Sequence, residues 1–205
     1  MSMERDVLNL YKSKKPIIDS YLDRSKSRTR EEVWFELCFC LLTPQSKANL
    51  CRSTLERLRE SGKLFTGTDT HISKEMTSVR FCNNKAKYIV EAREKFDDIF
   101  GKIIELRHRP LELREYLVKN VKGYGYKESS HFLRNIGLGD DLAILDRHVL
   151  RYMKRFKIKE PKTLSRKSYL EYEKRFLAIS KKLGLKAAEL DSAIWLDGSG
   201  SDEIM

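Results

Sequence analysis

Apolar residues recur every three or four positions along most of the chain, which is the spacing of one face of an α-helix. Glycines and prolines separate these segments, and no segment alternates apolar and polar residues as a half-exposed strand would. The segments lie at residues 33–41, 48–58, 86–99, 113–117, 132–136, 149–153, 172–183 and 187–194. The pattern predicts an all-α fold of roughly eight to eleven helices. We expect Gly62–Thr70 to interrupt the helices, and Gly198–Ser201 has the composition of a flexible tail.

The composition is that of a globular protein of modest size. The chain has 205 residues, and 40% of them are hydrophobic, which excludes disorder of the whole chain. The longest apolar runs, such as Leu37–Leu42, are far too short to span a membrane, so we expect no membrane partner. The four cysteines, at 38, 40, 51 and 82, form neither a disulfide scaffold nor a paired metal motif, and we expect buried structural thiols. Their positions also exclude a four-cysteine iron–sulfur loop near the C-terminus.

The charge is strongly basic and unevenly distributed. Lysine and arginine number 41 against 30 acidic residues, a net charge of +11, which suits a polyanionic partner and nucleic acid above all. Residues 151–182 hold 12 basic and 3 acidic side chains, whereas residues 183–205 hold 1 lysine and 5 acids. Residues 151–182 are therefore a candidate face for DNA phosphates, with a solvated helical surface as the alternative.

Two glycines one residue apart, Gly123 and Gly125, lie between two helical segments in the sequence Asn120-Val121-Lys122-Gly123-Tyr124-Gly125-Tyr126-Lys127. Such glycines permit positive φ and a close approach of the backbone. The second helix then begins near Tyr126, and the unpaired N–H groups at its positive end can hold a phosphate without reading a base. By itself a Gly-x-Gly turn is common, so the flanking residues decide its meaning.

From Val118 to Leu150 the chain resembles the helix–hairpin–helix motif of the DNA glycosylase superfamily. The class that this part of the chain most resembles is the archaeal-type 8-oxoguanine DNA glycosylase/AP lyase, on the sequences KGYGYKESSHFLRNIG and DLAILDRHVL. The same class also fits the segments LLTPQSKA and VRFCNNKAKYIVEAR. The resemblance covers about residues 30–195. It implies an endonuclease III-like fold of two lobes without an iron–sulfur cluster. The expected lobes are residues 1–30 plus 145–205, and residues 31–136 ending in the motif at about 112–136, with the site in the cleft between them.

In this resemblance Lys127 stands where bifunctional members carry their nucleophile. An amine that attacks C1′ of the sugar gives a Schiff base, which then permits elimination of the 3′ phosphate. This chemistry needs the uncharged amine, and the positive end of the predicted helix, nearby Lys122 and partial burial all disfavour the ammonium form. Read by position alone, Lys127 is a surface lysine that binds phosphate.

Asp146 matches the essential aspartate of the superfamily. It stands where the next helix should start, so its simplest role is to cap that helix. The resemblance adds a charge role, in which the carboxylate stabilises the cationic transition state and helps to deprotonate Lys127. His148, two residues further on, is expected to contact a phosphate, whereas His131 is expected only to pack.

The resemblance also implies a monovalent cation, Na⁺ or K⁺, held by the backbone carbonyls of Lys119, Val121 and Tyr124. No cofactor is otherwise required. Backbone ligands leave no signature in the sequence, so this expectation comes from the superfamily only.

A glycosylase must hold its target base outside the helix stack. Phe81 and Trp195 match positions around the damaged base in the similar class, although by composition each is more readily a core residue. That class uses its C-terminal carboxylate to accept the N7–H of 8-oxoguanine, which here would be the carboxylate of Met205. Because this tail is acidic, Asp197 or Asp202 are the alternatives, as is a disordered tail.

Gln45, in the turn Thr43–Ser46, is expected either to enter the gap that a flipped base leaves or simply to start a helix. The resemblance as a whole implies a bifunctional glycosylase and lyase that excises 8-oxoguanine from duplex DNA in base excision repair. Two alternatives stay open: an endonuclease III-like glycosylase for oxidised pyrimidines, and a helix–hairpin–helix module that binds DNA without chemistry. A lysine and an aspartate nineteen residues apart favour an enzyme. We expect a monomer that is cytoplasmic and associated with the nucleoid.

Overall fold

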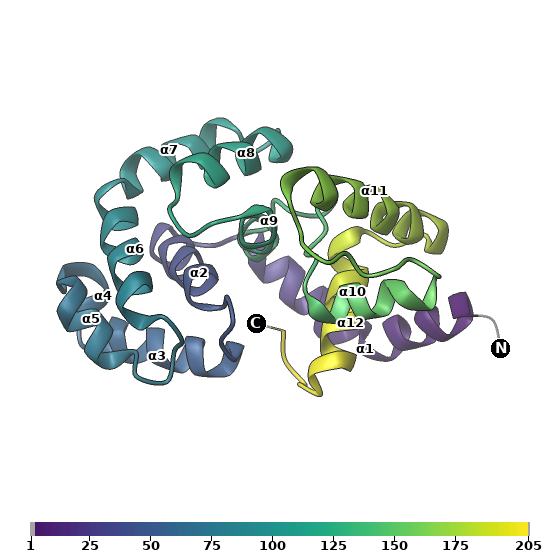
Figure 1. The fold of residues 1–205 in the computed structure, drawn as a ribbon, viewed down its shortest axis with the longest axis horizontal. Coiled ribbons are helices and arrows are strands. Elements are labelled where there is room, and N and C mark those ends of the chain that lie inside the picture. Colours follow the sequence, from purple (N-terminus) through teal and green to yellow (C-terminus); the bar gives the residue numbers. More distant parts are fainter. Residues whose placement is uncertain (1–2, 205) are drawn as a thin grey trace. The chain divides into compact units, whose positions relative to one another are not determined.

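Helices form all the regular structure in residues 3–204, the part of the chain that this computed structural model describes (Figure 1). They are α1 (Met3–Ser25), α2 (Arg30–Leu42), α3 (Ala48–Glu60), α4 (Lys63–Thr66), α5 (Asp69–Glu75), α6 (Cys82–Glu94), α7 (Phe96–Glu105), α8 (Pro110–Asn120), α9 (Tyr126–Asn135), α10 (Arg147–Arg155), α11 (Arg166–Leu183) and α12 (Ala187–Ser199). The all-α prediction is confirmed. The predicted number of helices was too low, because the expected break at Gly62–Thr70 contains the one-turn helix α4 and the start of α5.

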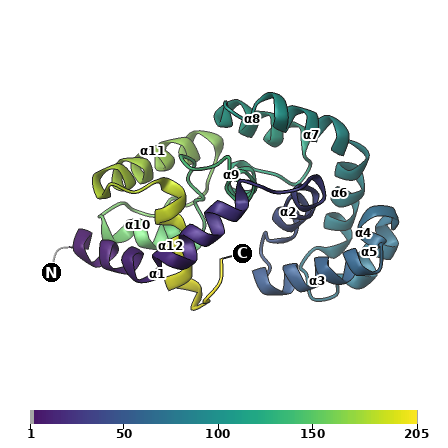
Figure 2. The same cartoon turned by 180° about the vertical axis from the view of Figure 1, so that it is seen from behind.

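The helix α1 was absent from the sequence prediction. It runs for 23 residues with Pro16 inside it, and a proline removes one hydrogen bond and crowds the preceding turn. Packing outweighs this penalty, because the buried side chains of Tyr11, Ile18 and Tyr21 lie in one cluster with residues of α12. Figure 2 shows α1 crossing α12, and the two helices are in contact.

By their internal contacts the described residues divide into two compact units. Unit 1 holds the chain up to Ser27 together with Leu133–Ile204, and unit 2 holds Arg28–Phe132. The division falls inside α9. Lys127 therefore belongs to unit 2 and Asp146 to unit 1.

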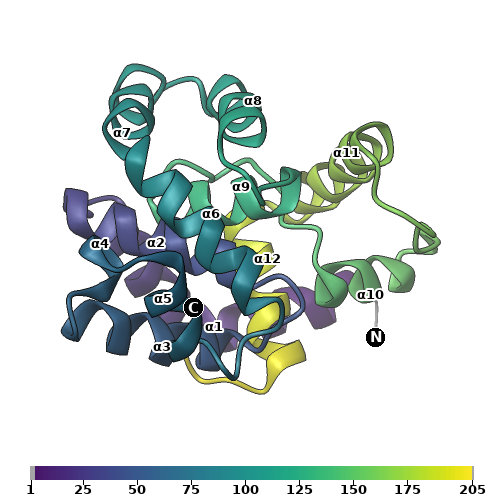
Figure 3. The same cartoon turned by 60° about the vertical axis from the view of Figure 1, so that its left-hand side comes forward.

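Unit 2 is built around α2. Thr29 caps this helix with a reciprocal pair of hydrogen bonds to Glu32, and every residue from Val33 to Leu42 is buried. The single apolar stripe predicted here is therefore too narrow, since the helix is covered on all sides by neighbours that include α3 and α6. In Figure 3, α7 and α8 of the same unit lie side by side.

Unit 1 carries its core between α1 and α12. Ala193 and Leu196 of α12 pack with the α1 side chains, and Ile204 joins them with 8% of its surface exposed. The prediction of a flexible tail at Gly198–Ser201 was wrong, because α12 continues to Ser199 and the chain beyond it folds back to bury Ile204.

The cysteines are free thiols, as predicted: Cys38, Cys40 and Cys51 are buried and Cys82 is half-buried. Within residues 3–204, no three acidic, histidine or cysteine side chains are grouped as a metal site would require. No described helix combines the length and the apolar character that a membrane crossing needs.

Candidate active site

The predicted hairpin joins α8 to α9. Gly123 has a φ of +94°, and a Cβ atom at this position would lie 2.6 Å from ring carbon Cδ2 of Tyr88. Both the backbone conformation and the lack of space require glycine, so the positive φ and the close approach expected at Gly123 are confirmed. Tyr124 then closes the turn, since its N–H donates to the carbonyl of Val121 at 3.1 Å.

The side chain of Tyr124 anchors the hairpin to α2. Its hydroxyl donates to the carbonyl of Leu37 at 2.9 Å, and burial holds the pKa of this hydroxyl well above its usual value. The hairpin is therefore fixed at its centre on the most buried helix of unit 2.

Gly125 directly precedes α9, and its N–H donates to Oε2 of Glu128 at 3.1 Å. The other carboxylate oxygen of Glu128 lies 3.5 Å from Nζ of Lys127. The expectation that the N–H groups here point freely toward a phosphate is therefore wrong for Gly125, because a glutamate three residues into a helix reaches back to this N–H. Glu128 was not among the predicted site residues, although a glutamate three residues after Gly125 is the signal that could have revealed it.

Lys127 lies in the first turn of α9, as predicted, and its side chain is 25% exposed. Within unit 2 it interacts electrostatically with Lys85 and Cys51. The pKa of Lys85 is lowered to about 8, mainly by burial and in part by the charge of Lys127. Lys127 thus belongs to a partly buried, electropositive region of unit 2.

Lys122 is directed toward α6. Its Nζ lies 3.6 Å from Oε2 of Glu91 and 5.7 Å from the ring centre of Tyr88. The side chain is 62% exposed, so its amine is accessible from solvent.

The three backbone carbonyls that are expected to hold a monovalent cation come from the end of α8 and from the turn that follows it. Lys119 lies in the last turn of α8, where carbonyls have no partner inside the helix and form its negative end. The carbonyl of Val121 accepts one hydrogen bond, from Tyr124, and keeps a second lone pair. Neutral oxygens at a negative helix end suit a monovalent cation, so the donor set fits.

Asp146 caps α10, as predicted. Its Oδ1 accepts hydrogen bonds from the backbone N–H groups of His148 and Val149, both at 2.8 Å. The carboxylate is half-buried, and the cap uses only one of its two oxygens.

The loop before Asp146 is fixed by α11, which the sequence analysis did not anticipate. The N–H of Ala143 donates to Glu173 at 3.1 Å, and the hydroxyl of Tyr169 donates to the carbonyl of Ala143 at 2.6 Å. Tyr169 and Glu173 are four residues apart and buried on α11. They hold the backbone that places Asp146.

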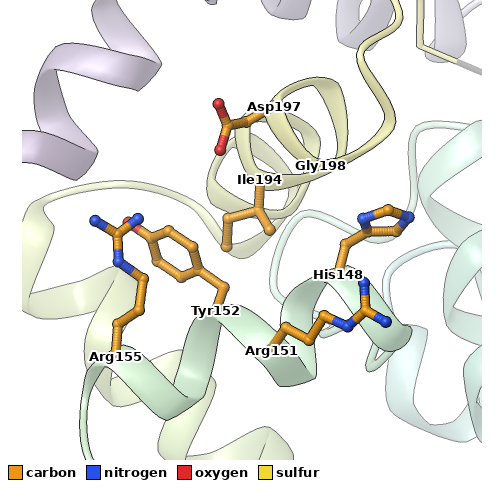
Figure 4. A pocket seen from close by; sticks show the side chains of 7 residues that line it. All are labelled: His148, Arg151, Tyr152, Arg155, Ile194, Asp197 and Gly198. Carbon is orange, nitrogen blue, oxygen red and sulfur yellow. The ribbon is translucent and has the colours of Figure 1, made fainter.

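His148 contributes to a pocket of about 240 Å³ between α10 and α12 (Figure 4). Its lining residues are His148, Arg151, Tyr152, Arg155, Ile194, Asp197 and Gly198. The guanidinium of Arg155 lies 5.1 Å from the ring centre of Tyr152. The pocket belongs to unit 1 alone and is mainly cationic, so its chemistry suits a phosphate.

Gln45 and Phe81 are exposed residues of unit 2 with left-handed backbone, at φ values of 57° and 58°. Phe81 is 56% exposed, which excludes the core role that its composition suggested. Gln45 does not start a helix, because α3 begins three residues later at Ala48.

Trp195 of unit 1 is half-buried and packs against the cluster formed by α1 and α12. Met205 lies outside the described residues. Asp202 is on the surface with its side chain 94% exposed, and it lies 3.7 Å from Nζ of Lys14.

Comparison with known proteins identifies the family. The model of the 8-oxoguanine DNA glycosylase family Ogg-HhH matches residues 15–185. The chain belongs to this family. The expected membership and the helix–hairpin–helix fold are thereby confirmed.

Relatives of known name match over most of their length. A protein of Methanocaldococcus jannaschii named 8-oxoguanine DNA glycosylase/AP lyase is 41% identical over 189 residues, which is 88% of each chain. One of the same name from Fusobacterium nucleatum is 38% identical over 182 residues, covering 84% of this chain and 82% of the relative.

Solved structures of the family share the fold. The M. jannaschii 8-oxoguanine glycosylase/lyase in complex with a 15mer DNA containing 8-oxoguanine has a TM-score of 0.89 at 35% identity, and the match covers 100% of both chains. The 8-oxoguanine DNA glycosylase of Thermotoga maritima has a TM-score of 0.86 at 30% identity, with 98% of each chain covered.

Proposed function

We propose that this protein is a bifunctional 8-oxoguanine DNA glycosylase and AP lyase that acts on double-stranded DNA in base excision repair. The observation that carries the proposal is the placement of Lys127 in the first turn of α9, directly after the glycine hairpin, in a chain of the Ogg-HhH family. The alternative of a module without chemistry uses neither Lys127 nor Asp146. The relatives reported above are named 8-oxoguanine DNA glycosylase/AP lyase, which favours 8-oxoguanine over oxidised pyrimidines as the substrate.

Lys127 acts as the nucleophile. Its uncharged amine forms a bond to C1′ while the bond from C1′ to the base breaks, and the base leaves with the bonding electrons and takes up a proton. The sugar ring then opens to give a Schiff base between the lysine and C1′. Loss of a proton from C2′ allows the C3′–O bond to break, which releases the 3′ phosphate.

Asp146 provides a fixed negative charge. The sugar carries positive charge as its bond to the base breaks, and a carboxylate that is already oriented stabilises this charge without reorganisation. The free oxygen left by the cap can also accept the proton of the lysine ammonium. One residue thus serves both as a helix cap and in the reaction.

The flipped base is held by Phe81 and Trp195, with a carboxylate as the acceptor for the N7–H that distinguishes 8-oxoguanine from guanine. The carboxylate of Met205 is the acceptor that the family relationship implies. Asp197, which lies on the wall of the pocket between α10 and α12, and the exposed Asp202 are the alternatives.

The DNA strand is bound through phosphates and through the gap that the base leaves. The hairpin backbone at Gly123 and Gly125, the amine of Lys122 and the ring of His148 contact phosphates, and Gln45 fills the gap. The N–H of Gly125 can join this contact only when Glu128 releases it.

A monovalent cation at the carbonyls of Lys119, Val121 and Tyr124 would add positive charge to the hairpin, where a phosphate approaches. The reaction itself needs no further cofactor, because the amine and the carboxylate supply its chemistry. We further propose that the protein works as a monomer in the cytoplasm, in association with the nucleoid.

The test is a set of duplexes that carry 8-oxoguanine, an oxidised pyrimidine, uracil or an adenine mismatch, each incubated with and without borohydride. We expect borohydride to trap a covalent complex with the 8-oxoguanine duplex, because it reduces the Schiff base. Lys127→Gln should abolish trapping. Lys102→Gln is the control, since that amine pairs with Glu105 on α7. Trapping by Lys127→Gln, or a preference for another duplex, would contradict the proposal.

A further inference from the structure

Two turns of unit 2 carry unusual backbone at exposed residues. Outside glycine, only Gln45, Phe81 and Lys157 have positive φ among residues 3–204. Left-handed backbone is strained for residues with a side chain, and it persists only where the surroundings impose it. Gln45 and Phe81 are exposed, so the packing of their own side chains does not impose it.

The side chain of Lys85 holds the turn that carries Gln45. Nζ of Lys85 donates to the carbonyls of Leu42 and Pro44, both at 2.7 Å, and to Oγ of Ser46 at 3.2 Å. The residues that provide these three oxygens lie on both sides of Gln45 in the sequence. The backbone N–H of Lys85 donates to the carbonyl of Phe81 at 3.0 Å, which is the first hydrogen bond of α6 and does not depend on the side chain.

Ser46 joins the two turns directly. Its hydroxyl oxygen accepts a hydrogen bond from the Lys85 ammonium and another from the backbone N–H of Arg80, the latter at 3.1 Å. The turn at Gln45 and the turn before Phe81 are therefore parts of one hydrogen-bonded network.

The choice of a lysine is notable because its position is unfavourable for a charge. Lys85 is 5% exposed, and the ion pairs of the described residues provide it with no carboxylate. A buried ammonium is normally paired or becomes neutral. Here its three donors are satisfied only by neutral oxygens, all of them in the turn that carries Gln45.

We propose that Lys85 is a positioning residue, which holds Gln45 directly, and Phe81 through Ser46, in the conformation in which they engage the DNA around a flipped base. This inference rests on the proposed function. Lys85 contacts neither the base nor the sugar, and acts through the two residues that it holds.

The protonation of Lys85 gives the inference a pH signature. Its pKa is lowered to about 8, mainly by burial, and the charged or titratable groups that face it are Cys51, Cys82, Lys127 and Glu128. Above this pH the side chain of Lys85 is a neutral amine, which has one N–H donor fewer than the ammonium for the oxygens of the turn at Gln45. Because the usual pKa of 10.5 applies in the unfolded chain, the folded state binds fewer protons between pH 8 and 10.5, and this group raises stability as pH rises through that range. Ordering of the turn and global stability should therefore change in opposite directions.

The decisive experiment is a double-mutant cycle of Lys85→Met and Gln45→Ala. The readouts are the single-turnover rate of excision and the fluorescence of a 2-aminopurine placed beside 8-oxoguanine, which reports extrusion of the base. We expect Lys85→Met to slow excision by about 10- to 100-fold, the scale for a misplaced positioning group. In the Gln45→Ala background the same change should have a much smaller effect, because its partner is already lost.

Lys87→Met, an exposed lysine on the same helix, is the matched control and should show no coupling to Gln45. If Lys85→Met does not fold, Ser46→Ala removes one acceptor of the network and should show the same coupling more weakly. Independent, multiplicative effects, or a Lys85→Met protein with the wild-type rate and fluorescence, would overturn the inference. A wild-type protein that does not excise 8-oxoguanine would instead refute the proposed function.

Discussion

The ring of His148 lies directly against the backbone of Gly198. A Cβ atom on Gly198 would come within 2.3 Å of Nδ1 of the histidine, closer than any real side chain allows. Gly198 lies inside α12, where glycine is normally unfavourable relative to alanine. The glycine is therefore explained by the ring that occupies the space beside it.

Gly198→Ala should consequently be harmful. We expect it to lower the free energy of unfolding by about 1 to 3 kcal/mol through overpacking and to displace His148, which thermal unfolding and the histidine NMR signals would detect. Gly101→Ala on α7 is the matched control, because nothing lies within 4 Å of the added atom. That variant should gain about 0.5 to 1 kcal/mol. A stabilised Gly198→Ala protein would contradict this account.

Asp146→Asn separates the two roles of this residue. Asparagine caps helices as well as aspartate does, so α10 and the melting temperature should be preserved. The excision rate should fall by about 10²-fold or more, because the fixed negative charge is lost. Asp146→Ala should lose about 1 kcal/mol of stability in addition. If Asp146→Asn turned over at the wild-type rate, the residue would be a cap and nothing else.

The salt dependence of DNA binding tests the cationic pocket. Arg151 and Arg155 line it, whereas Lys154 on the same helix pairs with Glu160. If each arginine neutralises a phosphate, Arg151→Gln and Arg155→Gln should each reduce the slope of log K against log salt by about 1. Lys154→Gln should leave the slope nearly unchanged. Equal slopes for all three variants would argue against a phosphate site in this pocket.

A buried ion pair joins α9 to α12 within unit 1. Nη1 of Arg134 lies 2.7 Å from Oδ2 of Asp191, and both side chains are less than 5% exposed. Asp191→Ala should lower the free energy of unfolding by about 3 to 5 kcal/mol, since it removes the charged partner of a buried guanidinium. Denaturant unfolding would measure this loss. Asp19→Ala, which removes an exposed pair with Lys15, should change stability by no more than about 1 kcal/mol.

The features that the sequence predicted correctly are encoded locally. The glycine at 123, the start of α9 at Tyr126 and the cap at Asp146 each depend on a few neighbouring residues, and their types were sufficient. Glu128 was also within reach, because its distance from Gly125 is that of a helix-capping glutamate.

Other features depend on contacts between distant parts of the chain. Lys85 is one of 41 basic residues, and only the fold brings it to Pro44, 41 positions earlier. Likewise α1 contains a proline and is stabilised by α12, more than 160 positions later. In the sequence Gly198 resembled a linker residue. The ring that requires a glycine there belongs to His148, which is 50 positions earlier in the chain. Local patterns cannot report such packing.

The burial of residues 33–42 of α2, and of Cys51 on the neighbouring helix α3, has a consequence for oxidative damage. Cys38, Cys40 and Cys51 have no exposed surface, and burial raises the pKa of Cys38 well above its usual value and that of Cys51 to about 11. Peroxides attack accessible thiolates, and none of these three sulfurs is accessible. A protein that repairs oxidised DNA thus keeps three of its own most oxidisable atoms out of reach of the agents that create its substrate.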